Sequence, residues 1–309
     1  MPGWRQTNYL KLWPCLVLLF LTACAGSAWD DEEGLGLADL PDNGQEVEIV
    51  PQKVSLFPGK IALATYPWQA SSPVQEIICD GRSVPYFFHD GQLKAYLTDS
   101  YFAKAPRGFH CTVNYKWKKN ARSRVLWIVQ VKKYFYPQEK LQVDKKHVIL
   151  SKADQKRVAR ERQITAKVYQ KSHALPYFRE GFQRPLDSKI TSYYGRRRIF
   201  NKGVHTQHLG TDFRAAIGTP IKNVNTGKVV LVADLFYTGN TVIVDHGLDI
   251  FSIYGHLSKP EVEEGDMVLP GDIIGLSGDT GRVSGPHLHW GVRMQGLSSD
   301  GLSLVKAGF

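Results

Sequence analysis

The sequence contains few sulfur-containing residues. Its 309 residues include only four Cys and three Met, which excludes a densely disulfide-bonded scaffold and a Cys-rich zinc array. The 28 Gly and 16 Pro are too few for a collagen-like or low-complexity chain. Hydrophobic residues make up 43% of the chain and charged residues 22%, so ordinary packed cores are expected, and the length predicts about two domains.

Acidic residues are missing from the beginning of the chain, where a positively charged stretch precedes the apolar run 12–21. This run is too short to cross about 30 Å of hydrocarbon as a helix and predicts a signal peptide over 1–23. The run ends in Leu-Thr-Ala-Cys, which resembles the lipobox of bacterial lipoproteins and implies lipidation of Cys24. The alternative is an ordinary signal peptide cut after Ala23 or a little beyond. In either case we expect an exported chain.

Lipidation would hold the chain on a membrane through its lipid anchor. By resemblance to sorted lipoproteins, the expected location is the periplasmic face of the outer membrane.

Positive charge is concentrated in one part of the chain, whose net charge is +10. Residues 26–50 carry eight acidic and no basic residues, and 24–50 are predicted to form an acidic flexible tether. Residues 51–185 carry 25 Lys and Arg against 9 Asp and Glu, whereas 186–309 carry 12 of each. Because an exported protein does not ordinarily meet nucleic acid, we expect no nucleic-acid partner and favour an anionic polymer of the cell envelope.

Short apolar and aromatic runs separated by turn signals predict a basic β-sandwich accessory domain over 51–148. Cys79 and Cys111 lie in two of these runs, so a disulfide between them is the leading hypothesis in an oxidising compartment. Two buried free thiols are the alternative.

The basic excess of this domain includes a run of Lys and Arg around Tyr115 and Trp117. These rings and charges predict either a polymer-binding face or a solvated hairpin tip.

Residues 149–185 are predicted to form a linker helix and a connector. Ser151 can cap a helix over 151–172, with Asp154 in the capping-box position. Lys and Arg cover all but a patchy apolar stripe, which predicts a basic helix lying on a domain.

Residues 186–309 contain 18 of the 28 Gly between Val- and Ile-rich runs, which predicts compact β structure with tight corners. A hairpin is expected at 241–254, where two such runs flank Asp-His-Gly.

Five polar residues of this segment can carry chemistry. His287 and His289 are two apart, so in a strand both point to one face. His208 and Asp212 have a spacing that fits a helical turn, with a bent strand or loop as the alternative. Together with His256 they make the inventory of a hydrolytic zinc site, in which imidazole and carboxylate ligands leave one position open for water.

The order of these residues and their neighbours resembles the lysostaphin/LytM-type zinc endopeptidases over about 186–296. The resemblance is carried by HLGTD at 208–212, GTPI at 218–221, DHG at 245–247, YGHLS at 254–258, GDTG at 278–281 and GPHLHW at 285–290. It implies a mainly β chain whose C-terminal domain, 186–309, has the duplicated hybrid motif fold of these peptidases. Relatives often continue with Val-Asp-Pro or Val-Asn-Pro after the last motif, and this chain does not.

The resemblance also implies the roles of the five residues. His208, Asp212 and His289 would bind one Zn²⁺, and His256 and His287 would flank the attacking water. Which of these two is the general base stays open. His205, three residues before His208, is an alternative ligand.

These features predict a metalloendopeptidase that hydrolyses peptide cross-links of bacterial peptidoglycan, between D-Ala and a diamino acid, with a metal-activated water. The alternative is a non-catalytic peptidoglycan-binding activator or scaffold for a cell-wall amidase. A regulatory protein partner is compatible with either function.

Overall fold

The computed structural model describes residues 48–68, 72–141, 150–200 and 204–309, all within the compact unit Leu35–Phe309. The predicted signal peptide, Cys24 and almost all of the predicted tether lie outside the described residues. Within the described part of the chain, no helix is long and apolar enough to span a membrane.

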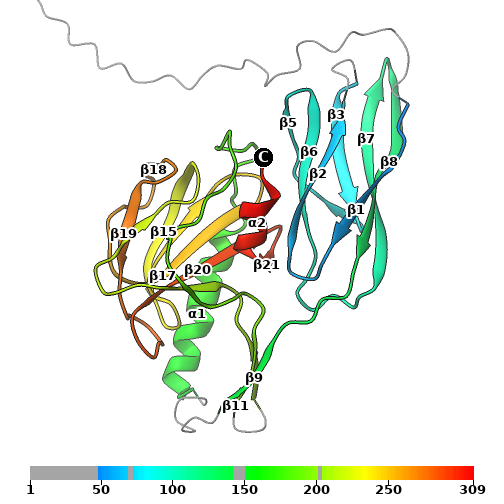
Figure 1. The fold of residues 1–309 in the computed structure, drawn as a ribbon. Helices are drawn as coiled ribbons and strands as arrows, with labels where there is room; N and C mark the ends of the chain where they lie inside the picture. The colour runs from blue at the N-terminus through cyan, green and yellow to red at the C-terminus, as the bar shows by residue number, and fades with distance from the viewer. Residues whose placement is uncertain (1–47, 69–71, 142–149, 201–203) are drawn as a thin grey trace, which may run out of the picture. The chain divides into compact units, whose positions relative to one another are not determined.

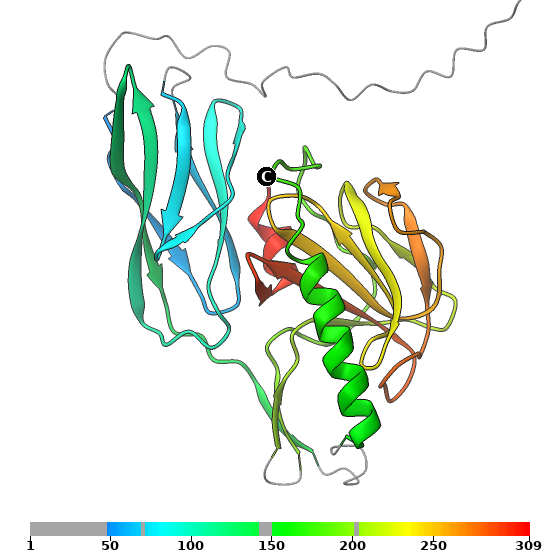
Figure 2. The same ribbon diagram turned by 180° about the vertical axis from the view of Figure 1, so that it is seen from behind.

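The first eight strands form two sheets that share one core, as Figures 1 and 2 show. One sheet has the order β1-β8-β7-β3-β4 and the other the order β2-β6-β5. The strands are β1 (Gln52–Leu56), β2 (Ile61–Pro67), β3 (Val74–Cys79), β4 (Arg82–Ser83), β5 (Phe87–His89), β6 (Gln92–Thr98), β7 (Arg107–Trp117) and β8 (Asn120–Val131). We call these strands and their loops the accessory region.

The core of the accessory region is aromatic and contains a disulfide. Trp68 and Tyr115 pack edge to face, with ring centroids 5.3 Å apart. Cys79 and Cys111 face each other across β3 and β7 and are joined by a disulfide bond. Alternating inward and outward positions on paired strands thus supply both the packing and the covalent link.

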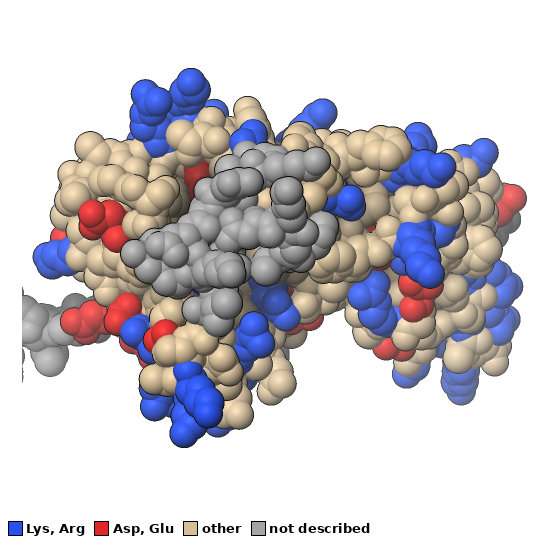
Figure 3. All heavy atoms as spheres, turned by 90° about the horizontal axis from the view of Figure 1, so that it is seen from below, with Lys and Arg blue, Asp and Glu red and all other residues tan. Residues whose placement is uncertain are grey.

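The basic run forms the hairpin between β7 and β8, with Lys118 and Lys119 at its turn. Tyr115 and Trp117 point into the core, where they are 0% and 8% exposed. The structure therefore does not bring these two rings to a polymer-binding face, because strand alternation puts them on the side opposite to Lys116. Nζ of Lys118 lies over the Trp117 ring, 5.6 Å from its centroid. Figure 3 shows that Lys and Arg nonetheless outnumber Asp and Glu on the visible face of the accessory region.

A strand and a helix connect the two β parts. Strand β9 (Gln138–Leu141) joins β11 (Arg197–Phe200) and β12 (Val204–Gln207) in a small sheet. Helix α1 (Lys152–Val168) packs on β15 (Gly227–Leu235). Ser151 caps the helix by accepting a hydrogen bond from the Asp154 amide. The helix ends four residues before the predicted position, and Asp245 holds the chain beyond it by accepting hydrogen bonds from the Ser172 hydroxyl and the His173 amide.

The C-terminal strands build a ten-stranded antiparallel assembly with the central order β10-β13-β20-β17-β16-β15-β18, to which β14, β19 and β21 add at the sides. The predicted hairpin is formed by β16 and β17. The elements are β10 (Ile190–Ser192), β11 (Arg197–Phe200), β12 (Val204–Gln207), β13 (Thr211–Arg214), β14 (Pro220–Lys222), β15 (Gly227–Leu235), β16 (Gly239–Asp245), β17 (Ile250–Pro260), β18 (Met267–Val268), β19 (Ile273–Ser277), β20 (His287–Met294), β21 (Leu297–Ser299) and α2 (Gly301–Ala307).

After the last motif, where this chain lacks the Val-Asp-Pro or Val-Asn-Pro of its relatives, the residues form a strand and a short helix. Strand β21 turns back on β20, and Asp300 then caps α2. Helix α2 packs against β2 of the accessory region, and the side chains of Lys60 and Asp300 form an ion pair there. The mainly β fold with a linking helix is therefore confirmed, whereas the boundaries at 51–148, 149–185 and 186–309 stay predictions.

Candidate metal centre

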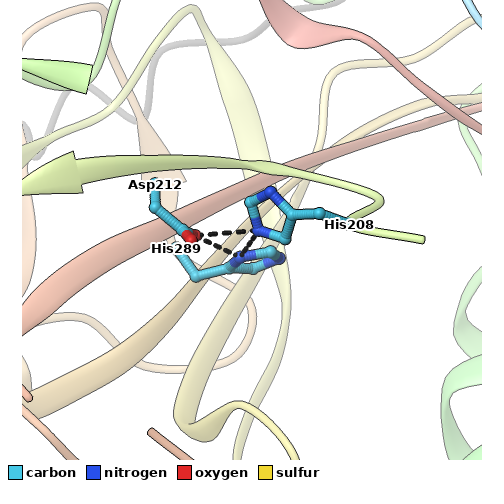
Figure 4. Close-up of side chains that lie close together, drawn as sticks. All are labelled: His208, Asp212 and His289. Carbon is cyan, nitrogen blue, oxygen red and sulfur yellow. Dashed lines mark hydrogen bonds and ion pairs between the residues drawn. The ribbon is translucent and has the colours of Figure 1, made fainter. Parts of the chain in front are cut away.

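Three side chains from two adjacent strands and a loop converge at one point (Figure 4). Strands β13 and β20 are antiparallel with Asp212 directly opposite His289, and His208 lies in the loop that enters β13. Oδ1 of Asp212 is 3.0 Å from Nε2 of His208 and 2.9 Å from Nδ1 of His289. The two imidazole nitrogens are 3.2 Å apart. In the part of the chain that the structure describes, no other group of His, Cys, Asp and Glu has this convergence.

The His208–Asp212 spacing is resolved as a loop followed by a strand, not as a helical turn. Gly210 lies at the bend between them and lets the loop approach His289 closely. A β-carbon added at Gly210 would lie 2.4 Å from Cε1 of His289, which is closer than real side chains allow. The glycine is therefore part of the geometry of the site.

His208 is oriented by contacts at its second nitrogen. Nδ1 is 3.1 Å from the hydroxyl oxygen of Ser192 and 3.2 Å from the carbonyl oxygen of Tyr193. A histidine ligand commonly donates its other N–H to an oxygen, which fixes the tautomer and leaves Nε2 with its lone pair for a metal. Ser192 was not predicted as a site residue, because no motif marks it and only the pairing of β10 with β13 brings it to the site.

The electrostatics of the cluster favour an ionised carboxylate next to a neutral His289 imidazole. Burial by itself would raise the pKa of Asp212, but the adjacent imidazoles of His208 and His289 outweigh it and hold this pKa well below its usual range. Burial lowers the pKa of His289, and the neighbouring Asp212 opposes this shift only in part. A negative charge with two imidazole nitrogens is the donor set that Zn²⁺ accepts, whereas Mg²⁺ and Ca²⁺ prefer oxygen ligands alone.

His256 and His287 lie beside this cluster, with their ring centroids 4.7 Å apart. Nδ1 of His256 is 2.8 Å from the carbonyl oxygen of Thr280, and Nδ1 of His287 is 2.8 Å from that of Gly285. Because a carbonyl oxygen can only accept, both Nδ1 atoms carry the proton, and both Nε2 atoms are left as acceptors. Nε2 of His287 is 3.7 Å from Oδ1 of Asp212, so this nitrogen faces the cluster.

An irregularity in β17 aims His256 at the site. The register of β16 and β17 shifts between Tyr254 and Leu257, and His256 has a left-handed φ of 62°. Such a bulge redirects a side chain, and a left-handed non-glycine residue inside a strand stores strain. Burial and the neighbouring His289 lower the pKa of His256 to about 4. Thr280 lies in the GDTG motif, but no pattern in the chain indicates that its carbonyl oxygen orients His256.

His246, another histidine near the motifs, lies apart from the cluster. His246 is fully buried and makes hydrogen bonds with the Thr226 carbonyl and the Ser252 hydroxyl, which is a structural role. The side chain of His205, the alternative ligand, lies outside the described part of the chain.

The geometry agrees with comparisons to known proteins. Residues 206–300 match the profile of peptidase family M23. Residues 206–300 therefore form a domain of peptidase family M23, which we call the M23 domain. Over 120 residues, this chain is 46% identical to the peptidoglycan DD-endopeptidase ShyA of Vibrio cholerae, covering 37% of this chain and 28% of ShyA. It is also 35% identical over 120 residues to the DD-carboxypeptidase/endopeptidase Mpg of Neisseria meningitidis, covering 38% of this chain and 27% of Mpg.

These alignments span less than a third of each curated relative. A solved structure extends the likeness further. A Pseudomonas aeruginosa protein assigned to peptidase M23 superimposes with a TM-score of 0.62 and 27% identity, covering 81% of this chain and 95% of that one. This coverage is more than the M23 domain alone can supply, so the similarity of fold includes the accessory region.

Proposed function

We propose that the protein is a zinc-dependent endopeptidase that hydrolyses peptide cross-links of bacterial peptidoglycan, between D-Ala and a diamino acid. The observation that carries this proposal is the convergence of His208, Asp212 and His289, with two further imidazoles whose Nε2 atoms are free to accept protons. The DD-endopeptidase named among the relatives supports the bond type.

His208, Asp212 and His289 would hold the ion. Bound zinc would supply Lewis-acid chemistry, which acidifies water and polarises the scissile carbonyl. His256 and His287 then have complementary tasks. One neutral Nε2 can accept the proton of the attacking water, and the other imidazole, once protonated, can donate a hydrogen bond to the developing oxyanion.

The proposed setting is the bacterial cell envelope. The Cys79–Cys111 disulfide is typical of exported proteins, since cytosolic thiols are kept reduced. The predicted signal peptide supports export, and Cys24 is the proposed site of a lipid anchor that holds the enzyme at the periplasmic face of the outer membrane.

The test is digestion of purified cross-linked muropeptide dimers, with mass spectrometry of the products. Zinc-loaded wild type should yield monomers, and His289→Ala should yield none and retain no stoichiometric zinc. The matched control is His110→Ala, because His110 is an exposed histidine of β7 outside the M23 domain.

One result would overturn the proposal in favour of the alternative function. If zinc-loaded wild type left the dimers intact and instead accelerated an added cell-wall amidase, the protein would be an activator. The disposition of five intact site residues argues against that outcome.

A further inference from the structure

The backbone of His208 is held by one short segment that precedes the M23 domain, residues 193–197. The amide of Gly195 donates to the carbonyl of His208 at 2.7 Å, and the amide of His208 donates to the carbonyl of Arg196 at 2.9 Å. The Tyr193 carbonyl in the same segment contacts the His208 ring. Any displacement of this segment would therefore displace the proposed zinc ligand.

This segment is in turn held from the accessory region and from the chain that leaves it. The hydroxyl of Tyr101 donates to the carbonyl of Gly195 at 2.9 Å and accepts a hydrogen bond from Nε of Arg197 at 3.2 Å. The amide of Arg197 donates to the carbonyl of Pro137 at 2.9 Å, and β9 then pairs in parallel with β11. The partners thus come from about 60 to 100 positions earlier in the chain.

The packing at Gly195 is equally close. Gly195 has a φ of +83°, and a β-carbon there would lie 2.0 Å from the ring of Tyr136. The Tyr136 hydroxyl is fixed by the Pro58 carbonyl at 2.7 Å. Tyr101, Tyr136 and Tyr194 form a buried cluster against Leu209, the residue directly after His208. The ring centroids of Tyr101 and Tyr136 are 4.7 Å apart.

We propose that Tyr101 and Tyr136 are positioning residues for His208, so that the accessory region and the chain that leaves it complete the metal site of the M23 domain. Tyr101 acts through its hydrogen bond to Gly195 and Tyr136 through the packing of its ring on Gly195, and Gly195 in turn bonds to His208. Neither tyrosine would contact the ion directly. The proposal rests on the proposed function only in taking His208 as a zinc ligand.

The experiment measures zinc affinity of the purified protein by competition with a chromophoric chelator. Tyr101→Phe removes the hydrogen bond to Gly195, and Tyr136→Leu removes the ring that packs on it. Loss of a group that orients a metal ligand costs about 10- to 100-fold in affinity. Because these tyrosines act through the backbone, we expect the lower end, about 10-fold, for each variant.

The matched control is Tyr96→Phe. Tyr96 is also a buried tyrosine of the accessory region, and its hydroxyl donates across to the C-terminal residues, to the Gly308 carbonyl at 2.6 Å. It does not touch residues 193–197, so its loss tests whether weakened docking alone lowers zinc affinity. Zinc affinity of Tyr96→Phe should stay within twofold of wild type.

A spectroscopic readout separates positioning from general destabilisation. In cobalt-substituted protein, the visible absorption bands report ligand geometry. These bands should shift in Tyr101→Phe and Tyr136→Leu and stay unchanged in Tyr96→Phe. Unchanged bands and wild-type zinc affinity in both cluster variants would overturn the proposal, as would an equal loss in Tyr96→Phe.

These readouts need no peptidoglycan. A wild type that binds zinc but cleaves no muropeptide would refute the proposed function and leave this inference standing. A wild type that binds no zinc would refute both.

Discussion

The accessory region and the M23 domain bury polar groups very differently. Few polar side chains are buried in the accessory region, namely Ser72, Lys94, Thr98 and Asp99. The M23 domain buries more of them, including Asp212, His246, Ser252 and His256. Burying a polar group without a hydrogen-bond partner costs free energy. The fold of this domain must therefore place a partner beside each of these side chains.

The two regions also use left-handed backbone differently. In the accessory region, Asp80, Asp90 and Lys118 adopt positive φ in turns. In the M23 domain, Leu248, Asp249 and Gln295 also do so in turns, but His256 does so inside a strand and in a buried place. The accessory region is thus stabilised by packing and a disulfide bond, whereas the M23 domain contains strained backbone that orients a histidine of the site.

The largest expected effect concerns His256, the histidine of the M23 domain that the strained backbone orients. His256→Ala should lower the rate of cross-link cleavage by about 10²- to 10⁴-fold, the usual contribution of a general acid or base. Because His256 is not among the three proposed ligands, zinc content should not change. Steady-state kinetics and elemental analysis test both parts, with His287→Ala as the partner variant. Loss of zinc together with activity would contradict the division of roles.

The second prediction concerns the disulfide bond of the accessory region. Replacing both Cys79 and Cys111 by Ala should lower the free energy of unfolding of the accessory region by about 3 to 4 kcal/mol on the chain-entropy account. Urea titration followed by Trp127 and Trp68 fluorescence measures the loss. Wild type with a reducing agent should give the same midpoint. An unchanged midpoint would show that the aromatic core alone is sufficient.

The third prediction concerns a buried polar group of the M23 domain. Burial lowers the pKa of His246 to about 4 from an unfolded value near 6.5. The unfolded chain therefore binds a proton that the folded chain refuses, and stability is lost as pH falls from about 6.5 to about 4. The difference is worth about 3 kcal/mol.

Urea midpoints of the metal-free protein between pH 7.5 and pH 4 test this dependence. His246→Gln should be less stable at neutral pH and should show a smaller decline below pH 6.5, since the part of the decline due to His256 and His289 remains. An equal decline in the variant would assign the effect to other groups.

The smallest expected effect concerns a residue with positive φ in a turn of the accessory region. Lys118, the first residue of the β7–β8 turn, has a φ of 53°. A turn with a left-handed first position favours Gly, so Lys118→Gly should stabilise by about 0.5 to 1 kcal/mol. Lys119→Gly is the control and should destabilise, because that residue has no positive φ. If the urea midpoints of both variants shifted in the same direction, the result would contradict this explanation.

The amino-acid sequence alone determined the mainly β fold, the helix cap at Ser151 and the residues of the candidate site. Periodicity and turn residues are local, and the motifs around His208, His256 and His289 are contiguous, so neither requires knowledge of distant contacts. The same local information left open which side of β7 is buried. The second sheet decided that Tyr115 and Trp117 point inward.

Only the tertiary structure decided how the site is assembled. His208 and His289 are 81 residues apart and meet because β13 pairs with β20 in a register that places Asp212 opposite His289. The tautomers of His256 and His287, the contact of Gly210 with His289, and the tyrosines around Gly195 depend on distances of 2 to 4 Å between remote segments. Such distances follow from how strands pair and pack, and no local pattern in the chain encodes them.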